Sequence, residues 1–512
     1  MKKTAVSLLL LTTLVGRAQT NAPADSGTND VVFPQVIWQS PTPPSNHVLT
    51  LQDCLQAAIA HNFDVRIEQF EPQKAALDLQ SAYASAYDPT FHFSIDRTYD
   101  NNTWVVPSNS PPYPLISKTH SVSSSVDGKL PGFGTGYSLF GGTDDGYAPG
   151  PEGASSQLGF KVTQPLLKNF WIDGQRLAIS AAKNNLKLSK QGLRQQLITT
   201  VTEVETAYYE LIFQRDNLRV QQEAVDLAKK QLEDDKQRVQ VGSLAPLDVQ
   251  QDEAQVAQSL SGWISAQSTF SGALRNLKQL ISDDYSRWLA DDIIPALTLD
   301  APLRSFDLQE SWNLGLSQRP DILQARLNLE QMGIQLKYDR NQIFPSLDLT
   351  GTIGYNGAGN SSSAALGPWG QSDRSYYSYG AELSIPLSNL GARSAYKSDK
   401  ASQQQMVLSL KKLEQQIMTM IDNDIALARS AYANVTATKQ ARIYAEAALH
   451  SEEEKYKVGK STTFTVLQLQ NNLTKARSQE LRALADYNVS LATLSQDEGI
   501  SLERHQIEVS AK

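Results

Sequence analysis

Two long stretches of the chain carry apolar residues at every seventh position. The first row is Leu197, Val204, Leu211, Leu218, Val225, Leu232 and Val239. Beyond a glycine-containing turn the spacing resumes at Val249, Val256, Trp263, Phe270 and Leu277. A sustained seven-residue period keeps a narrow apolar stripe against neighbouring helices and imposes a left-handed supercoil. The pattern therefore predicts long helices over residues 176–241 and 247–281, the first reaching ~100 Å at 1.5 Å per residue.

The same organisation occurs a second time along the chain. A second row, broken only at Arg442, lies 217 residues after the first and consists of Ile421, Ala428, Val435, Arg442, Leu449 and Tyr456. Val458-Gly459 repeats Val241-Gly242 at the same offset. We therefore predict two structural repeats with a connector between them. Their boundaries are residues 49–281 and 306–497, a connector over 282–305, second-repeat helices over 393–457 and 463–496, and a C-terminal tail over 498–512.

Each repeat also contains segments in which apolar and polar residues alternate. Phe91, Phe93 and Ile95 begin this pattern in the first repeat, where it extends over residues 90–164, and the second repeat shows it over 346–386. Segments of ~9–11 residues with one apolar face are typical of outer-membrane barrel strands. We predict two such strands per repeat, hence four per chain. An additional hairpin over residues 117–140 is interpreted as an extracellular extension, with two extra membrane strands as the alternative.

Four strands cannot form a closed membrane barrel alone, because the smallest common barrel has about eight. An open sheet edge in lipid would leave backbone N–H and C=O groups without partners. Two copies of the chain would supply eight strands, and three copies twelve. The narrow apolar stripe on the helices likewise requires further helices. A soluble sandwich with a coiled-coil extension is the alternative on the alternation pattern alone.

The N-terminus has the pattern of an export signal. Lys2 and Lys3 precede a short apolar stretch, and Gly16-Arg17-Ala18 supplies small residues for cleavage. We predict a signal peptide over residues 1–18, followed by a proline-rich linker over residues 19–48. The apolar stretch is too short to cross ~30 Å of hydrocarbon as a helix.

Composition narrows the function further. The 512 residues carry a net charge of −8, which argues against a nucleic-acid partner. The mean hydropathy of −0.36 excludes a polytopic helical membrane protein. With a single cysteine, Cys54, the chain cannot form an internal disulfide or a cysteine-based metal cluster. Gly132-Phe133-Gly134 lacks the third glycine of a dinucleotide loop and reads as a turn. We expect no enzyme activity, no cofactor and no metal site.

These features resemble the TolC-like outer membrane efflux proteins. The similarity is carried by Gln164-Pro165-Leu166-Leu167, Ala207-Tyr208, the turn from Val241 to Val249, and Tyr456-Lys457-Val458-Gly459-Lys460. It implies an α+β membrane protein, internally duplicated, with long α-helical hairpins and four transmembrane strands per chain completing a trimeric 12-stranded β-barrel. The barrel would sit in outer-membrane lipid and continue as a helical tunnel through the periplasm.

The resemblance also implies a role and partners. Three chains would form the passive exit duct of a tripartite system for small molecules, docked to a periplasmic adaptor protein and an inner-membrane RND or ABC transporter. A type I protein-secretion channel is the first alternative. A periplasmic coiled-coil adaptor or structural protein is the second.

By the same resemblance, the periplasmic gate lies where the helical hairpins turn. Asp248 matches a gate acid that hydrogen-bonds a tyrosine on the neighbouring hairpin, and Tyr456 matches that tyrosine. Thr465 and Gln468 stand where two aspartates form a cation-selective ring, so strong cation selectivity is not expected. Asp248 could instead complement the dipole at a helix N-terminus.

The tips carry glycines and a set of exposed residues. Gly242 and Gly459 permit the positive φ that a sharp turn between helices requires. The candidate adaptor-docking residues on these tips are Ser243, Leu244, Pro246, Lys460 and Thr462.

Overall fold

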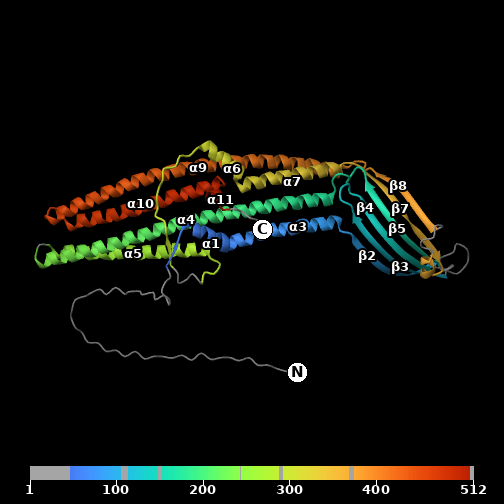
Figure 1. Cartoon of the computed structure of the whole chain (residues 1–512), viewed down its shortest axis with the longest axis horizontal. Helices are drawn as coiled ribbons and strands as arrows, with labels where there is room; N and C mark the ends of the chain where they lie inside the picture. The colour runs from blue at the N-terminus through green and yellow to red at the C-terminus, as the bar shows by residue number, and fades with distance from the viewer. Residues whose placement is uncertain are drawn as a thin grey trace, which may run out of the picture. The chain divides into compact units, whose positions relative to one another are not determined.

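The computed structural model describes residues 46–104, 113–147, 153–242, 244–286, 292–367 and 374–507. The predicted signal peptide, the linker up to residue 45 and Ser243 lie outside this range. In the described part, two long helical hairpins are joined at one end to a β-sheet (Figure 1). No helix in these ranges combines the length and apolar character needed to cross a membrane.

The hairpins consist of four helices. α4 (Gly174–Gln240) and α5 (Pro246–Ile281) form the first, and α9 (Leu390–Lys457) and α10 (Thr463–Asp497) form the second. The 67 residues of α4 and the 68 of α9 correspond to ~100 Å of helix. Asp173 starts α4 by accepting a hydrogen bond from the Arg176 backbone N–H at 2.8 Å. The duplication predicted from the two apolar rows is present in the fold.

Shorter helices precede each hairpin in corresponding places. In the first repeat they are α1 (Leu51–His61), α2 (Phe63–Glu68) and α3 (Phe70–Tyr87); in the second, α6 (Leu308–Gln318) and α7 (Pro320–Gln342). In the connector, β6 (Asp292–Pro295) pairs in parallel with β1 (Asn46–Leu49). Two very short helices, α8 (Ser362–Leu366) and α11 (Ser501–Arg504), complete the described helices.

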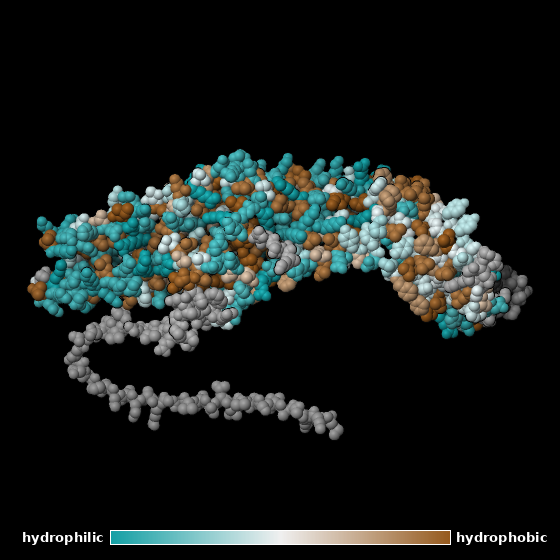
Figure 2. All heavy atoms as spheres, in the orientation of Figure 1, coloured by the Kyte–Doolittle hydropathy of each residue, from teal (hydrophilic) through white to brown (hydrophobic). Residues whose placement is uncertain are grey.

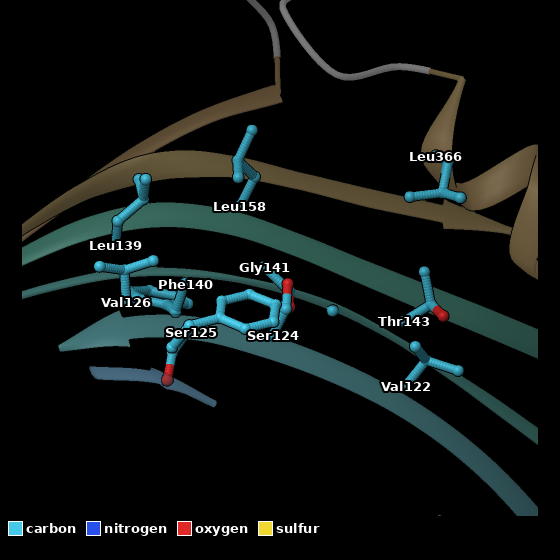
Figure 3. Close-up of a pocket in the computed structure, with 12 residues that line it drawn as sticks. Val122, Ser124, Ser125, Val126, Leu139, Phe140, Gly141, Thr143, Leu158 and Leu366 are labelled. Atoms are coloured by element: carbon cyan, nitrogen blue, oxygen red, sulfur yellow. The ribbon is translucent and has the colours of Figure 1, made fainter. Parts of the chain in front are cut away.

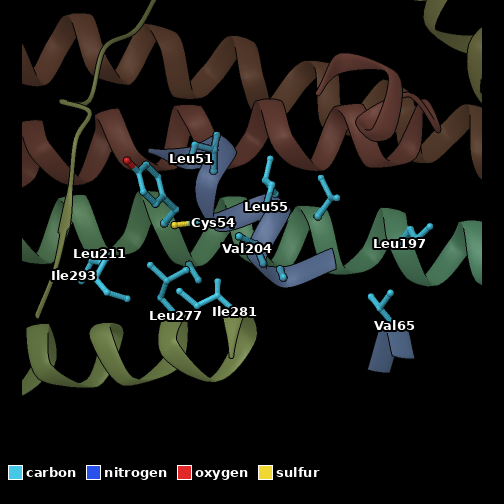
Figure 4. Packing of buried hydrophobic residues seen from close by; sticks show 14 of the residues in the cluster. Leu51, Cys54, Leu55, Val65, Leu197, Val204, Leu211, Leu277, Ile281 and Ile293 are labelled. Carbon is cyan, nitrogen blue, oxygen red and sulfur yellow. The ribbon is translucent and has the colours of Figure 1, made fainter. Parts of the chain in front are cut away.

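The largest apolar core lies where α1 packs between α4 and α5 (Figure 4). Leu197, Val204 and Leu211 from the predicted seven-residue row are buried here, and so are Leu277 and Ile281 of α5. Toward the tip Val225 of the same row is still buried, whereas Leu218, Leu232 and Val239 are only half-buried. The apolar packing of the first hairpin is therefore strongest near its middle and weakens toward the turn.

The sheet contains six antiparallel strands, which are the four predicted membrane strands and the two strands of the additional predicted hairpin. Their order is β2 (Thr90–Trp104), β3 (Tyr113–Lys129), β4 (Gly136–Tyr147), β5 (Gly153–Pro165), β7 (Ser346–Gly359) and β8 (Ser375–Ser384). The hairpin predicted over residues 117–140 as an extracellular extension is β3 and β4, inserted between β2 and β5. Alternation alone cannot reveal this, because it shows which face a side chain occupies and not which strand lies alongside.

Candidate functional site at the hairpin tips

Both hairpins reverse direction through a glycine in the left-handed region. Gly242 has φ of +77° and Gly459 has φ of +72°. A Cβ added at either position would meet no atom within 4 Å, so the requirement for glycine comes from the backbone conformation. The Lys460 N–H donates to the Lys455 carbonyl at 2.8 Å, which closes the end of α9.

The helices that leave the turns begin with different caps. Pro246 occupies the first turn of α5, where its missing N–H costs no helical hydrogen bond. Thr462 caps α10 by accepting a hydrogen bond from the Thr465 backbone N–H at 3.4 Å. Two of the predicted docking residues are thus also start signals for helices.

Four apolar side chains project into solvent around the tips. Val241 is 79% exposed and Leu247 62% on the first tip; on the second, Val458 is 68% exposed and Phe464 64%. None of the four was predicted as a docking residue, because they stand next to the predicted residues without a periodic pattern. Apolar side chains gathered at an exposed turn are typical of a protein-binding surface.

One buried carboxylate joins the two hairpins just above the turns. Asp235 of α4 is fully buried. The Tyr456 hydroxyl of α9 donates to its Oδ1 at 2.7 Å, and the Gln231 amide donates to its Oδ2 at 2.7 Å. The Thr463 hydroxyl of α10 lies 2.9 Å from that of Tyr456 and 3.4 Å from Asp235 Oδ2. The Arg238 guanidinium covers the Tyr456 ring at 4.5 Å. We call Asp235, Tyr456 and Thr463 the tip latch.

A second buried carboxylate adjoins the tip latch. Asp252 of α5 is 1% exposed, and neither of its oxygens accepts a hydrogen bond from a donor group. Burial, the charge and hydrogen bond of Asp235, and the charge of Asp248 raise the pKa of Asp252 to about 7. Asp252 therefore carries a proton in mildly acidic solution and ionises as the pH passes neutrality. Burial also raises the pKa of Tyr456 to about 12, so its hydroxyl remains a donor.

The predicted gate pair is not brought together within the chain. Tyr456 bonds Asp235 of α4, not Asp248, which lies in the first turn of α5. The reason is geometric: Tyr456 of α9 packs against α4, the helix that precedes the turn of the first hairpin, and not against α5, which follows it. Asp248 lies in the position where a carboxylate complements the helix dipole. Thr465 is half-buried and Gln468 is exposed, on the first and second turns of α10.

Above the tip latch, polar side chains connect the hairpins. Gln255 of α5 and Asn471 of α10 exchange two hydrogen bonds of 3.0 Å through their amides. Arg477 of α10 pairs with Glu223 of α4 at 3.0 Å, and Ser478 donates to Asn217 at 2.7 Å. The Arg477–Glu223 pair is exposed and contributes little net stability, and a neutral hydrogen bond contributes only about 0.5–1.5 kcal/mol. The lower halves of the hairpins are therefore held together more weakly than the apolar core above them.

Comparison with known proteins gives a family match. A family model described as "Outer membrane efflux protein" matches residues 129–282 and 313–497, which include both hairpins. The chain is 24% identical over 318 residues to the outer membrane protein TolC of Escherichia coli, covering 59% of this chain. That alignment spans 63% of the Escherichia coli protein. Identity to TolC of Vibrio cholerae is 26% over 362 residues, 69% of this chain and 78% of the relative.

Solved structures share the fold. The Campylobacter jejuni outer membrane channel CmeC superposes with a TM-score of 0.65 at 16% identity, covering 97% of this chain and 99% of the other. At that identity, the likeness concerns the architecture: helical hairpins attached to a sheet.

Proposed function

The chain belongs to the outer membrane efflux protein family, and we propose that three copies form the outer-membrane exit duct of a tripartite transport system. One observation carries this proposal: the same chain contains a sheet with two unpaired edges and helical hairpins of ~100 Å. The edge strands β2 and β8 require partners in lipid, which further copies supply. The helices are long enough to carry the duct through the periplasm.

The distribution of polar and apolar side chains on the surface supports placing the sheet in the membrane and the hairpins in the periplasm. In Figure 2, hydrophobic side chains gather over the strands, whereas the helical part is mainly hydrophilic with scattered hydrophobic positions. The sheet end is thus suited to lipid and the hairpin end to the aqueous periplasm. The duct performs no chemistry and is a passive channel for small molecules. An inner-membrane RND or ABC transporter supplies the energy for their export.

The mass of the purified protein tests the assembly. We expect the outer-membrane fraction to yield, in mild detergent, a heat-modifiable particle with three times the mass of the processed chain. A monomer recovered from the soluble periplasmic fraction would contradict the duct and support the coiled-coil adaptor instead.

The exposed apolar side chains at the tips support an adaptor-docking role for this end of the molecule. A photo-crosslinker at Leu247 or Val458 should capture a periplasmic adaptor protein in intact cells. A matched crosslinker at Leu303 of the connector, which is 78% exposed, should not. Equal capture at all three positions, or capture at Leu303 alone, would contradict docking at the tips.

Cargo can be tested separately from assembly. Deleting the gene should increase the accumulation of small toxic compounds in cells, and the intact chain should restore their efflux. If efflux is unchanged while a protein disappears from the culture medium, the type I secretion channel is the correct function.

A further inference from the structure

The inserted strands β3 and β4 bear directly on the size of the membrane pore. They lie between β2 and β5, and each is hydrogen-bonded along its length to both neighbours. Because β3 spans 17 residues and β4 spans 12, each exceeds the ~9–11 residues that cross a bilayer as a tilted strand. If they were taken out of the wall, β2 would lose its only neighbour in the described sheet, and β5 would pair with β7 alone.

The turn between β3 and β4 shows at which end of the sheet this hairpin begins. The Leu130 N–H donates to the Thr135 carbonyl at 2.8 Å, and the Gln164 amide donates to the Phe133 carbonyl at 3.1 Å. Arg176, in the first turn of α4, donates to the Gly132 carbonyl. The turn is therefore attached to the junction of sheet and helix, which is the periplasmic end.

Aromatic packing strengthens the same attachment. The Phe133 ring stacks on Phe170 with centroids 5.1 Å apart, and Trp171 meets it edge-on at 5.9 Å. Gly134 has φ of +73°, and a Cβ there would lie 2.8 Å from the Asn169 carbonyl. Since the hairpin starts at the periplasmic end, its strands must run the full height of the sheet.

A continuous row of apolar side chains crosses all six strands. In register order it is Phe91, Val126, Leu139, Phe160, Ile353 and Tyr377. Val126 and Leu139 line the same hollow as Leu158 of β5, and Figure 3 shows Leu366 of α8 at the other end of this hollow, near Thr143. The inserted strands thus continue the apolar face of the sheet without a break.

The opposite face carries small and uncharged polar residues in a matching row. This second row is Ser94, Ser123, Gly142, Gln157 and Asn356. An apolar face toward lipid and a polar face toward the lumen is the pattern of a water-filled membrane barrel.

We propose that β3 and β4 are membrane-spanning wall strands, so that a trimer of this chain closes an eighteen-stranded barrel with a wide, polar lumen. The stoichiometry rests on the proposed trimeric duct; the location of the hairpin does not. At equal strand tilt the diameter grows roughly in proportion to strand number, so the pore is about one and a half times as wide as one of twelve strands. The duct therefore admits bulkier solutes at its membrane end than a twelve-stranded wall would.

Thiol labelling of paired positions tests this location. Single cysteines replace Val122 and Leu139 on the apolar face, and Ser123 and Ser138 on the polar face. Ile95→Cys and Ser94→Cys provide the matched reference pair on β2. The native chain is the blank, because its Cys54 is fully buried. Each variant must first run as a heat-modifiable oligomer, which shows that it folds.

With the protein in lipid vesicles, Val122→Cys and Leu139→Cys should match Ile95→Cys. They should react with a charged maleimide on the order of tenfold more slowly than Ser123→Cys and Ser138→Cys, because lipid excludes a charged reagent. A lipid-soluble maleimide should reverse the order. Equal reaction of all four β3 and β4 positions with the charged reagent would place the hairpin outside the membrane and overturn the inference, even if the particle has three chains. A monomeric particle with the alternating pattern would instead overturn the proposed stoichiometry.

Discussion

At the scale of single residues, the contact between the two hairpin tips depends on how one buried carboxylate is satisfied. Asp235 accepts hydrogen bonds from Tyr456 and Gln231 on two different helices, while the adjacent Asp252 accepts none. A buried acceptor that loses a donor costs about 1–3 kcal/mol, because no water replaces the donor. The network is therefore sensitive to single-atom changes.

Removing the Tyr456 hydroxyl should loosen the tip. We expect Tyr456→Phe to weaken the contact between the hairpins by about 1–3 kcal/mol and to raise the resting current across planar bilayers. Tyr444→Phe, on an exposed face of the same helix at 66% exposure, is the matched control and should change neither. Asp248→Ala should have a smaller effect than Asp235→Ala, since Tyr456 donates to Asp235. If the current is unchanged in both Tyr456→Phe and Asp235→Ala, the tip latch does not limit the resting current.

Asp252 should make the tip sensitive to pH. Because its folded-state pKa is raised, its neutral form stabilises the folded tip, and that contribution is lost as the pH rises from about 4 through about 7. Above that range Asp235, Asp252 and Asp248 carry like charges, with Arg238 of α4 as the nearby cation. We expect faster hydrogen exchange at the tips, and more resting current, at pH 8 than at pH 5.

The matched variant for this pH effect is Asp252→Asn, whose amide stays neutral and can donate to Asp235. It should keep the slow exchange at pH 8 and flatten the difference between the two pH values. Burial also raises the pKa of Asp424 to about 7, so Asp424 titrates in the same pH range. The difference between Asp252→Asn and the native chain is what isolates the contribution of Asp252. An equally steep pH dependence in Asp252→Asn would assign the effect to other groups.

At the scale of elements, the two glycine turns determine how the hairpins end. Gly242 and Gly459 adopt positive φ in open space, so their cost of substitution is conformational. Gly459→Ala should destabilise the second hairpin by about 1–2 kcal/mol, the penalty for an L-residue in the left-handed region. Gly459→Asn should cost less, because asparagine tolerates this region.

Gly391 provides the control for these turns. It lies in the first turn of α9 with no atom near its missing Cβ, and its φ is not positive. Gly391→Ala should leave the stability unchanged or raise it slightly, since alanine favours helix more than glycine does. The urea midpoint of the tip segment, followed by hydrogen exchange, checks both expectations. A loss in Gly391→Ala as large as that in Gly459→Ala would show that position, not φ, sets the cost.

At the scale of the whole molecule, the end of the chain holds the two repeats together. Leu502 of α11 follows the second hairpin but is buried in the apolar core of the first repeat. The His505 ring nitrogen lies 2.7 Å from the buried Glu205 Oε1 of α4. The predicted tail over residues 498–512 thus contains, up to residue 507, a segment docked onto the rest of the fold.

Shortening the Leu502 side chain should weaken the attachment of this C-terminal segment to the first repeat. We expect Leu502→Ala to cost about 2–5 kcal/mol in the free energy of unfolding, through lost burial and the cavity left behind. Glu503→Ala, which removes only an exposed pair with Arg194 at 3.7 Å, should cost less than about 1 kcal/mol. The temperature at which the oligomer dissociates on a heat-modifiability gel measures both. Similar shifts in the two variants would contradict a role for Leu502 in the core.

The sequence by itself determined the duplication, the hairpins and their turns, because these follow from local rules. A seven-residue apolar row marks α4 and α9, and glycine is needed where φ is positive. It also placed Tyr456 near the hairpin tips. Which side chain Tyr456 meets was decided only by the tertiary structure, since Asp235 and Asp248 are thirteen positions apart on different helices and both are aspartates.

The pairing of strands in the sheet was likewise decided only by the tertiary structure. Alternation in β3 and β4 was visible along the chain, but the pairing of β3 with both β2 and β4 is a contact between segments that alternation does not encode. Asp252 is a similar case: its sequence context is that of a solvated helix position, and only the packing of the folded chain, which buries it beside Asp235 of α4, removes water and raises its pKa. Periodicity is a property of one segment, whereas partners and dielectric environment depend on how several segments meet.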